Sequence, residues 1–175
     1  MRSIARLAIS VGLLIPMGII AGPAGAAGGT SCKTSAGKAT IIPGLSSAQT
    51  VQTIAATVTL SGCTGGGVSA GSGRATVKLG ATDCTGLAKG GSKGALTETI
   101  TWNTRRTSTF TGTTLSGTGA KVLQVAISGT VTVGLFKGSK VSTAFAYSVN
   151  AGQSCSKTSA ITGLSIKGLK PFVIG

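Results

Sequence analysis

The stretch from 123 to 135, LQVAISGTVTVGL, decides the fold class. Aliphatic residues and Gly129 occupy every second position, and the positions between them carry mainly glutamine, alanine, serine and threonine. A period of two places successive side chains on opposite faces of a strand. The stretch therefore predicts a long β-strand with one apolar face and one face of small, mostly polar side chains.

The same alternation recurs along most of the chain. Residues 54–61, 75–79 and 96–102 show it plainly, and weaker strands are expected at 32–42, 105–113, 141–149 and 159–167. No segment carries a convincing helical period. About eight strands predict an all-β fold in one domain, an antiparallel β-sandwich by preference, with a closed β-barrel as the alternative. Both architectures bury the same alternation, so the sequence leaves this choice open.

The first residues have the features of an export signal. Arg2 and Arg6 precede an apolar run over 7–20, and Ala24-Gly25-Ala26 fits a small-x-small cleavage site. We expect a signal peptide over 1–26 and a single β domain over 27–175; an uncleaved membrane anchor is the alternative. No later apolar segment approaches membrane-spanning length, so no transmembrane segment is expected after cleavage. The predicted location is secreted, extracellular or associated with the cell wall.

The four cysteines all lie in the part expected to be exported. An even number of cysteines in an exported chain indicates disulfides, here between Cys32, Cys63, Cys84 and Cys155. A zinc site is disfavoured because no two cysteines have the close C-x-x-C spacing. Cys32 opens the first expected strand and Cys63 follows the second. If these strands pair antiparallel, the sequence favours Cys32–Cys63 with Cys84–Cys155.

The shortage of acids and the lack of histidine argue against most enzyme classes. The chain has no histidine, and its only acids are Asp83 and Glu98. A Ser-His-Asp triad is impossible, and the two carboxyl groups occupy dissimilar settings. We predict no catalytic, cofactor-binding or metal-binding residue, and no enzymatic activity. Glu98 shares the apolar face of its strand, and we expect it to pair with a Lys or Arg; the alternative is an unusual active site around it.

Positive charge is the main functional feature of the sequence. Sixteen Lys and Arg residues give a net charge of +14, which falls to +12 when Arg2 and Arg6 leave with the signal peptide. Such a charge attracts polyanions, but stacking aromatics for specific nucleic-acid recognition are missing. The expected partner is an anionic cell-wall polymer or polysaccharide; the alternative is that the charge only maintains solubility. The candidate contacts are Arg74, Lys78, Arg105, Arg106, Lys137 and Lys140.

Two stretches resemble a pattern in exported actinobacterial proteins. They are the expected hairpin TITWN…TSTF over 99–110 and GTVTVGLFKG over 129–138. The group that they resemble consists of small Thr- and Gly-rich β-proteins with disulfides, mostly uncharacterised. The resemblance implies a secreted all-β domain, and it transfers no active site. Arg105 and Arg106 stand where a tight hairpin would favour Asn-Gly or Asp-Gly.

Together these observations predict a non-enzymatic β-domain protein that is secreted or associated with the cell envelope. Diffuse basic residues would contact anionic wall polymer, and the disulfides would stabilise a core built from small side chains. The alternative is a self-assembling surface or structural protein, in which long Thr-faced strands such as 122–135 supply the contact surface. The sequence does not set the oligomeric state.

Overall fold

The computed structural model describes residues 28–90, 92–117, 123–156 and 158–175. The signal peptide predicted for residues 1–26 lies outside these residues. Nine strands and one short helix follow in chain order: β1 (Thr30–Leu45), β2 (Thr50–Thr64), β3 (Ala70–Thr82), α1 (Cys84–Ala88), β4 (Lys93–Trp102), β5 (Thr107–Gly117), β6 (Leu123–Gly134), β7 (Lys140–Val149), β8 (Ile161–Gly168) and β9 (Phe172–Ile174).

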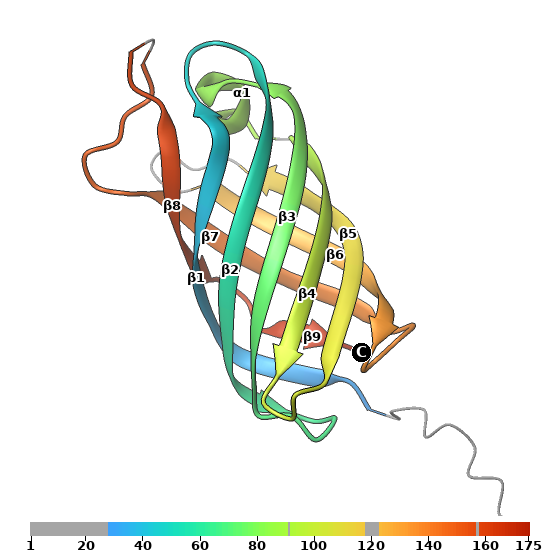
Figure 1. Cartoon of the computed structure of the whole chain (residues 1–175). Coiled ribbons are helices and arrows are strands. Elements are labelled where there is room, and N and C mark those ends of the chain that lie inside the picture. The colour runs from blue at the N-terminus through green and yellow to red at the C-terminus, as the bar shows by residue number, and fades with distance from the viewer. Residues whose placement is uncertain (1–27, 91, 118–122, 157) are drawn as a thin grey trace, which may run out of the picture.

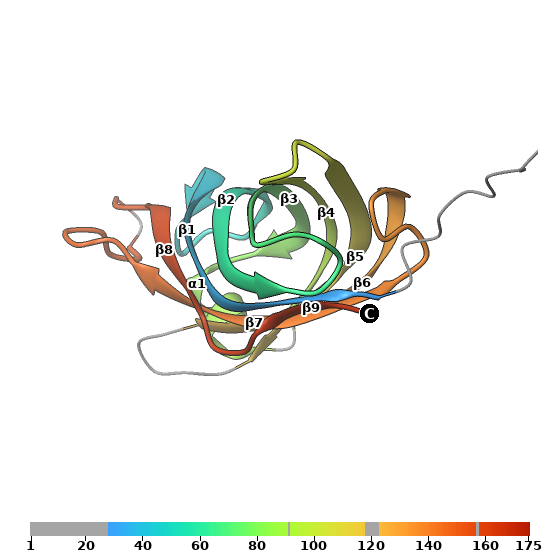
Figure 2. The same ribbon diagram turned by 90° about the horizontal axis from the view of Figure 1, so that it is seen from below.

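Eight of these strands form one antiparallel sheet that closes on itself (Figure 1, Figure 2). Strands β2 to β8 are neighbours in chain order, and β1 pairs with β2 on one side and with β8 on the other. The all-β prediction is confirmed, and the architecture is the closed barrel that the sequence left as the alternative to a sandwich. Closure pairs the first and last strands of the sheet and so removes its free edges.

Strand β9 supports the closure at the C-terminus. It pairs with β1 at 30–32 and with β7 at 141–142. Beyond the strand, the amide groups of Lys140 and Gly175 each donate to the carbonyl oxygen of the other residue at 2.9 Å. The last residues of the chain are therefore held against the barrel wall.

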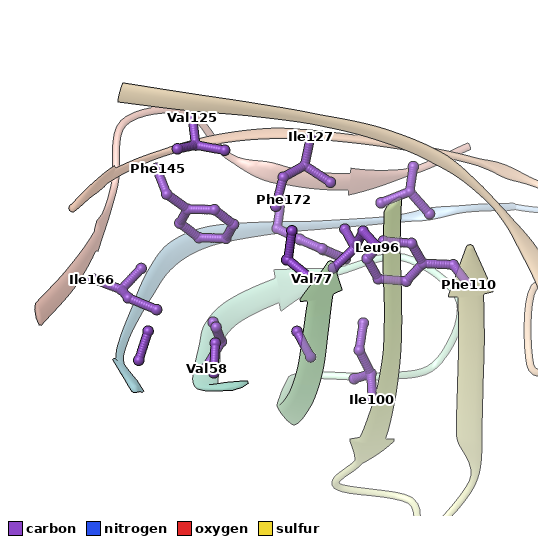
Figure 3. Close-up of a cluster of buried hydrophobic side chains, with 14 of the residues drawn as sticks. Val58, Val77, Leu96, Ile100, Phe110, Val125, Ile127, Phe145, Ile166 and Phe172 are labelled. Atoms are coloured by element: carbon purple, nitrogen blue, oxygen red, sulfur yellow. The ribbon is translucent and has the colours of Figure 1, made fainter. Parts of the chain in front are cut away.

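Apolar side chains fill the barrel interior. On β4 the inward positions are Leu96, Glu98, Ile100 and Trp102, all buried, and the positions between them are exposed. Figure 3 shows valine, leucine, isoleucine and phenylalanine side chains from strands around the barrel pointing into the same space. An eight-stranded barrel has an interior just wide enough for side chains to fill. The sheet therefore has one buried face and one solvent-facing face.

One expected inward residue lies outside. Val133 was expected on the apolar face of its strand but is 61% exposed. Thr109 pairs with Val133 while the next residue, Phe110, pairs with Val131, so β6 contains one extra residue at this point. A β-bulge of this kind shifts the alternation by one position. Val131 remains buried, and Val133 turns to solvent.

A short helix closes one end of the barrel, and a pair of aromatic rings closes the other. At one end the side chain of Leu87 on α1 is buried against the core, and Asp83 caps the helix by accepting a hydrogen bond from the Gly86 amide at 2.6 Å. At the other end the rings of Trp102 and Phe136 meet edge to face, 5.7 Å apart between centroids. The sequence did not predict α1, because five residues are too few to establish a helical period.

The disulfides form the pairs that the sequence favoured. Cys32 and Cys63 are register partners on β1 and β2, and Cys84 of α1 is bonded to Cys155 in the β7–β8 connection. The second bond ties α1 to a segment 71 residues away in the chain. No helix within the described ranges is long and apolar enough to span a membrane.

Candidate polyanion-binding surface

The described part of the barrel interior is filled by apolar side chains. A cavity of about 20 Å³ lies beside Leu87 and Tyr147, which is space for about one water molecule. Among the described residues no cluster of His, Cys, Asp or Glu could hold a metal ion. The outer face of the barrel, in contrast, carries exposed cations on several strands.

Two cations face each other across strand β2. Lys38 on β1 and Arg74 on β3 are both register partners of Thr57, one on each side, and all three side chains are exposed. Two residues along the strands, on the same outer face, Thr40 and Thr76 flank Ala55 in the same way. Thr57 and Ala55 of β2 are thus each bordered on both sides by longer side chains from β1 and β3.

This arrangement forms a groove of about 360 Å³, which we call the β2 groove. It is lined mainly by two cations, three threonines and an alanine: Lys38, Arg74, Thr40, Thr57, Thr76 and Ala55. Guanidinium and ammonium groups donate hydrogen bonds to anions, and threonine hydroxyl groups both donate and accept them. The β2 groove can therefore hold an anionic group beside neutral hydroxyl groups.

Two further cations belong to the same side of the barrel. Lys167 on β8 is the register partner of Ala36, two residues from Lys38, and Lys78 on β3 lies four residues beyond Arg74. Lys38, Arg74, Lys78 and Lys167 are called the lateral cations below. They lie on three strands, β8, β1 and β3, and β2 supplies the floor between β1 and β3. Because all four are exposed, they can contact a ligand without moving the barrel.

A second groove continues toward the far end of the barrel. It has a volume of about 320 Å³ and is bordered by Thr59 and Ser61 on β2, Ser72 on β3, and Asn103 in the β4–β5 turn. Thr59 is two residues from Thr57, so the two grooves follow one another along β2. The Asn103 side chain accepts a hydrogen bond from the Ser69 amide at 3.0 Å, which fixes the turn against the neighbouring loop.

A second group of cations lies at the end closed by Trp102 and Phe136. We call it the basic rim; its members are Arg105 and Arg106 in the β4–β5 turn and Lys137 and Lys140 around the β6–β7 turn. The two turns are held together because Ser108 Oγ accepts a hydrogen bond from Trp102 Nε1 at 2.8 Å and donates one to the Leu135 carbonyl at 2.6 Å. The rim is thus built on a rigid hydrogen-bonded base.

The expected hairpin forms at the rim with an unusual residue in its turn. The Arg105 amide donates to the Trp102 carbonyl, and the Trp102 amide donates to the Arg106 carbonyl, both at 2.9 Å. Arg105 has a φ of +63°. This is the geometry of a three-residue loop with a left-handed residue before the bulge, a position that favours glycine. The arginine there is strained and exposed.

The two acids lie away from the outer sheet face. Asp83 caps α1, and Glu98 points into the barrel with 2% of its surface exposed. Burial raises the pKa of the Glu98 carboxyl group from 4.5 to about 7. The expected pairing with Lys or Arg is wrong for the described residues, because every inward neighbour of Glu98 on the adjoining strands is uncharged.

The barrel accommodates Glu98 because its neighbours on β3, Gly73 and Ala75, are small. A Cβ atom on Gly73 would collide with Glu98 Oε1, so a larger residue at position 73 would require the Glu98 side chain to move. Burial, followed by the charge of Glu98, raises the pKa of Tyr147 on the opposite wall. The carboxyl group is enclosed by the core.

The six residues predicted to contact a polyanion lie in two places. Arg74 and Lys78 lie on the outer face of β3, and the other four form the basic rim. Lys38 and Lys167 were not among the six, although both occupy outward positions of expected strands. Their alternation with apolar neighbours indicated exposure, but only the register of β8, β1, β2 and β3 shows that they lie near Arg74.

Comparison of the chain with protein-family models, with curated proteins and with solved structures finds no match.

Proposed function

We propose that this protein is a non-enzymatic, exported β-barrel of the cell envelope that contacts anionic wall polymers through its basic outer face. The observation that carries the proposal is the β2 groove, where Lys38 and Arg74 border one threonine from opposite sides. A polymer lying along β2 would meet both cations at once.

The charge distribution supports this proposal. The described sheet places its cations outward, while its one strand-borne acid, Glu98, is buried. A surface of one sign raises the local concentration of oppositely charged polymers and speeds their association. The lateral cations need no rearrangement to bind because they extend from a closed barrel.

Export is supported by the disulfides and by the predicted signal peptide over 1–26. Disulfide bonds persist in oxidising environments outside the cytoplasm, and both bonds stabilise parts of the barrel that meet only in the folded chain. An exported protein with a strong positive charge encounters wall polymers and acidic polysaccharides first.

The alternative, a self-assembling surface protein, has less support. Barrel closure removes the free strand edges that promote assembly of sheets. The exposed large apolar side chains of the described residues are distributed around the barrel: Ile42 on β1, Val51 on β2, Val133 on β6, Val149 on β7, Leu169 after β8 and Val173 on β9. Outward charges of one sign also repel a second copy.

The test is retention of the purified mature chain on cell-wall material at increasing salt. If charge drives binding, affinity should fall as salt rises, and more steeply the more anionic groups the protein neutralises. The double variant Lys38→Gln with Arg74→Gln should lose about tenfold in affinity. The matched control, Lys137→Gln with Lys140→Gln, removes the same charge from the basic rim.

Retention that does not respond to salt would rule out charge-driven binding. Equal losses in the two double variants would show that total charge, and not the β2 groove, is responsible. Light scattering on the same samples tests the alternative, since oligomers that grow with protein concentration would favour self-assembly.

A further inference from the structure

We propose that the ligand of the β2 groove is a linear acidic polysaccharide whose single charges are separated by neutral, hydroxyl-bearing sugar units. This inference rests on the proposed function and names the class of polymer. It follows from the spacing of the lateral cations and from the side chains that lie between them.

The lateral cations are spaced out over the sheet, and the nearest pair, Lys38 and Lys167, are diagonal neighbours on β1 and β8. The register partners of Lys38 are Thr57 and Ser165, and those of Arg74 are Thr57 and Thr99. Strands lie about 4.8 Å apart in a sheet, so the Lys38 and Arg74 backbones are separated by roughly 10 Å across β2. Along the strand direction, Arg74 and Lys78 are four residues apart on β3, which is roughly 13 Å. No lateral cation has another cation as a register partner.

A densely charged polymer matches this surface poorly. Double-stranded DNA carries one charge per about 1.7 Å of its axis, so most of its charges over a single groove would face threonine and alanine instead of a cation. A polymer that runs along β2 with one charge per two or so sugar units places its charges at a spacing closer to that of Arg74 and Lys78 along β3.

The residues between the cations fit the neutral part of such a polymer. Thr40, Thr57 and Thr76 present hydroxyl groups that can donate to and accept from sugar hydroxyl groups, and Ala55 offers a small apolar floor. The described groove has no exposed aromatic ring on which a sugar could stack. Charge therefore has to anchor the polymer, and a neutral polysaccharide should not bind.

The length of the surface fits an extended chain. From Ala55 to Ser61 the outward residues of β2 are all Ala, Thr or Ser and are exposed. Six residues of strand span about 20 Å, which accommodates several sugar units in a row. The second groove extends this path to the β4–β5 turn, where Arg105 and Arg106 supply further cations.

The test compares four polymers on the mature chain by isothermal titration at one ionic strength. Hyaluronan has one carboxylate per disaccharide, polygalacturonate one per sugar, inorganic polyphosphate is densely charged, and dextran is neutral. We expect hyaluronan to bind most tightly per charge and dextran not to bind. Tighter binding of polyphosphate or polygalacturonate per charge would overturn the inference and leave the proposed function standing.

A hydroxyl variant separates sugar contacts from charge. Thr57→Val keeps the shape of the side chain and removes its hydroxyl group, so it should weaken hyaluronan about threefold to tenfold and leave polyphosphate unchanged. Thr111→Val, on the outer face of β5 away from the groove, is the control and should change neither. An equal effect of Thr57→Val on both polymers would contradict a sugar-specific role.

Failure of the proposed function gives a different result. In that case none of the three anionic polymers would bind in a salt-dependent way, and Lys38→Gln with Arg74→Gln would have no effect on any of them.

Discussion

The inner face of this barrel buries an ionisable side chain, whereas the outer face exposes its charged side chains to solvent. The inner face holds one ionisable acid, Glu98, among apolar side chains, and the outer face carries the lateral cations among hydroxyl groups. A buried charge loses its hydration, whereas an exposed cation keeps it. The same period of two along each strand therefore separates a face that determines stability from a face that is free to bind.

The largest contrast is expected between neighbouring residues of β5. Phe110 is fully buried and contacts the ring of Phe172, with the ring centroids 6.1 Å apart, while Thr111 points to solvent. Phe110→Ala should lower the free energy of unfolding by about 3–5 kcal/mol, and Thr111→Ala should change it by less than about 0.5 kcal/mol. Chemical denaturation measures both. Similar losses in the two variants would break the distinction between the faces.

The next effect concerns Glu98 and pH. Its pKa is raised in the folded state to about 7, above 4.5 in the unfolded chain, so the folded protein holds this proton more tightly. The resulting stability is fully present below the unfolded pKa and is lost as pH rises through the folded pKa. At 1.36 kcal/mol per pKa unit, the loss amounts to about 3 kcal/mol above pH 7.

Glu98→Gln should remove this pH dependence and make the variant more stable than the wild type at alkaline pH. The chain has no histidine, so no other side chain with an ordinary pKa titrates in this window. Tyr147→Phe is the control and should keep the pH dependence, because the pKa of Tyr147 is raised further above its usual alkaline value. A wild-type free energy of unfolding that stays constant between about pH 5 and about pH 8 would show that Glu98 is already paired or hydrated.

Much of the inner face was predictable from the sequence. The alternation around Glu98 placed it inward, and the positions of the cysteines favoured the pairing that forms. The sequence could not distinguish a barrel from a sandwich, because the alternation shows which face of a strand is buried but not which strands are neighbours. Val133 was misplaced because a bulge depends on the partner strand, which sequence alone does not identify.

The candidate site was predictable only in part. Arg74 and Lys78 could be recognised as exposed cations on a strand, but the groove needs Lys38, which is brought beside them by the pairing of β1 with β2 and of β2 with β3. Because a site on a sheet runs across strands, its residues are far apart in the chain. The sequence does not give the register between neighbouring strands, and this register is what brings Lys38 and Arg74 together.

The smallest effect is expected at Arg105, an exposed residue whose backbone conformation affects the stability of the protein. A left-handed conformation costs a non-glycine residue roughly 1–2 kcal/mol, and Arg105 has a φ of +63°. Arg105→Gly should therefore raise the free energy of unfolding by about 1 kcal/mol, a gain reduced by the greater freedom of glycine in the unfolded chain. Arg106→Gly removes the same charge from a residue without positive φ and should be neutral or destabilising.

The binding of these two variants to hyaluronan completes the comparison. If the basic rim continues the path from the β2 groove, Arg105→Gly should gain stability and lose affinity, and Arg106→Gly should lose affinity without the gain. The strain at Arg105 would then be the cost of holding a cation at the rim, as at other strained functional positions. Unchanged binding in Arg105→Gly would confine the ligand to the β2 groove, and unchanged stability would show that the turn relaxes around arginine.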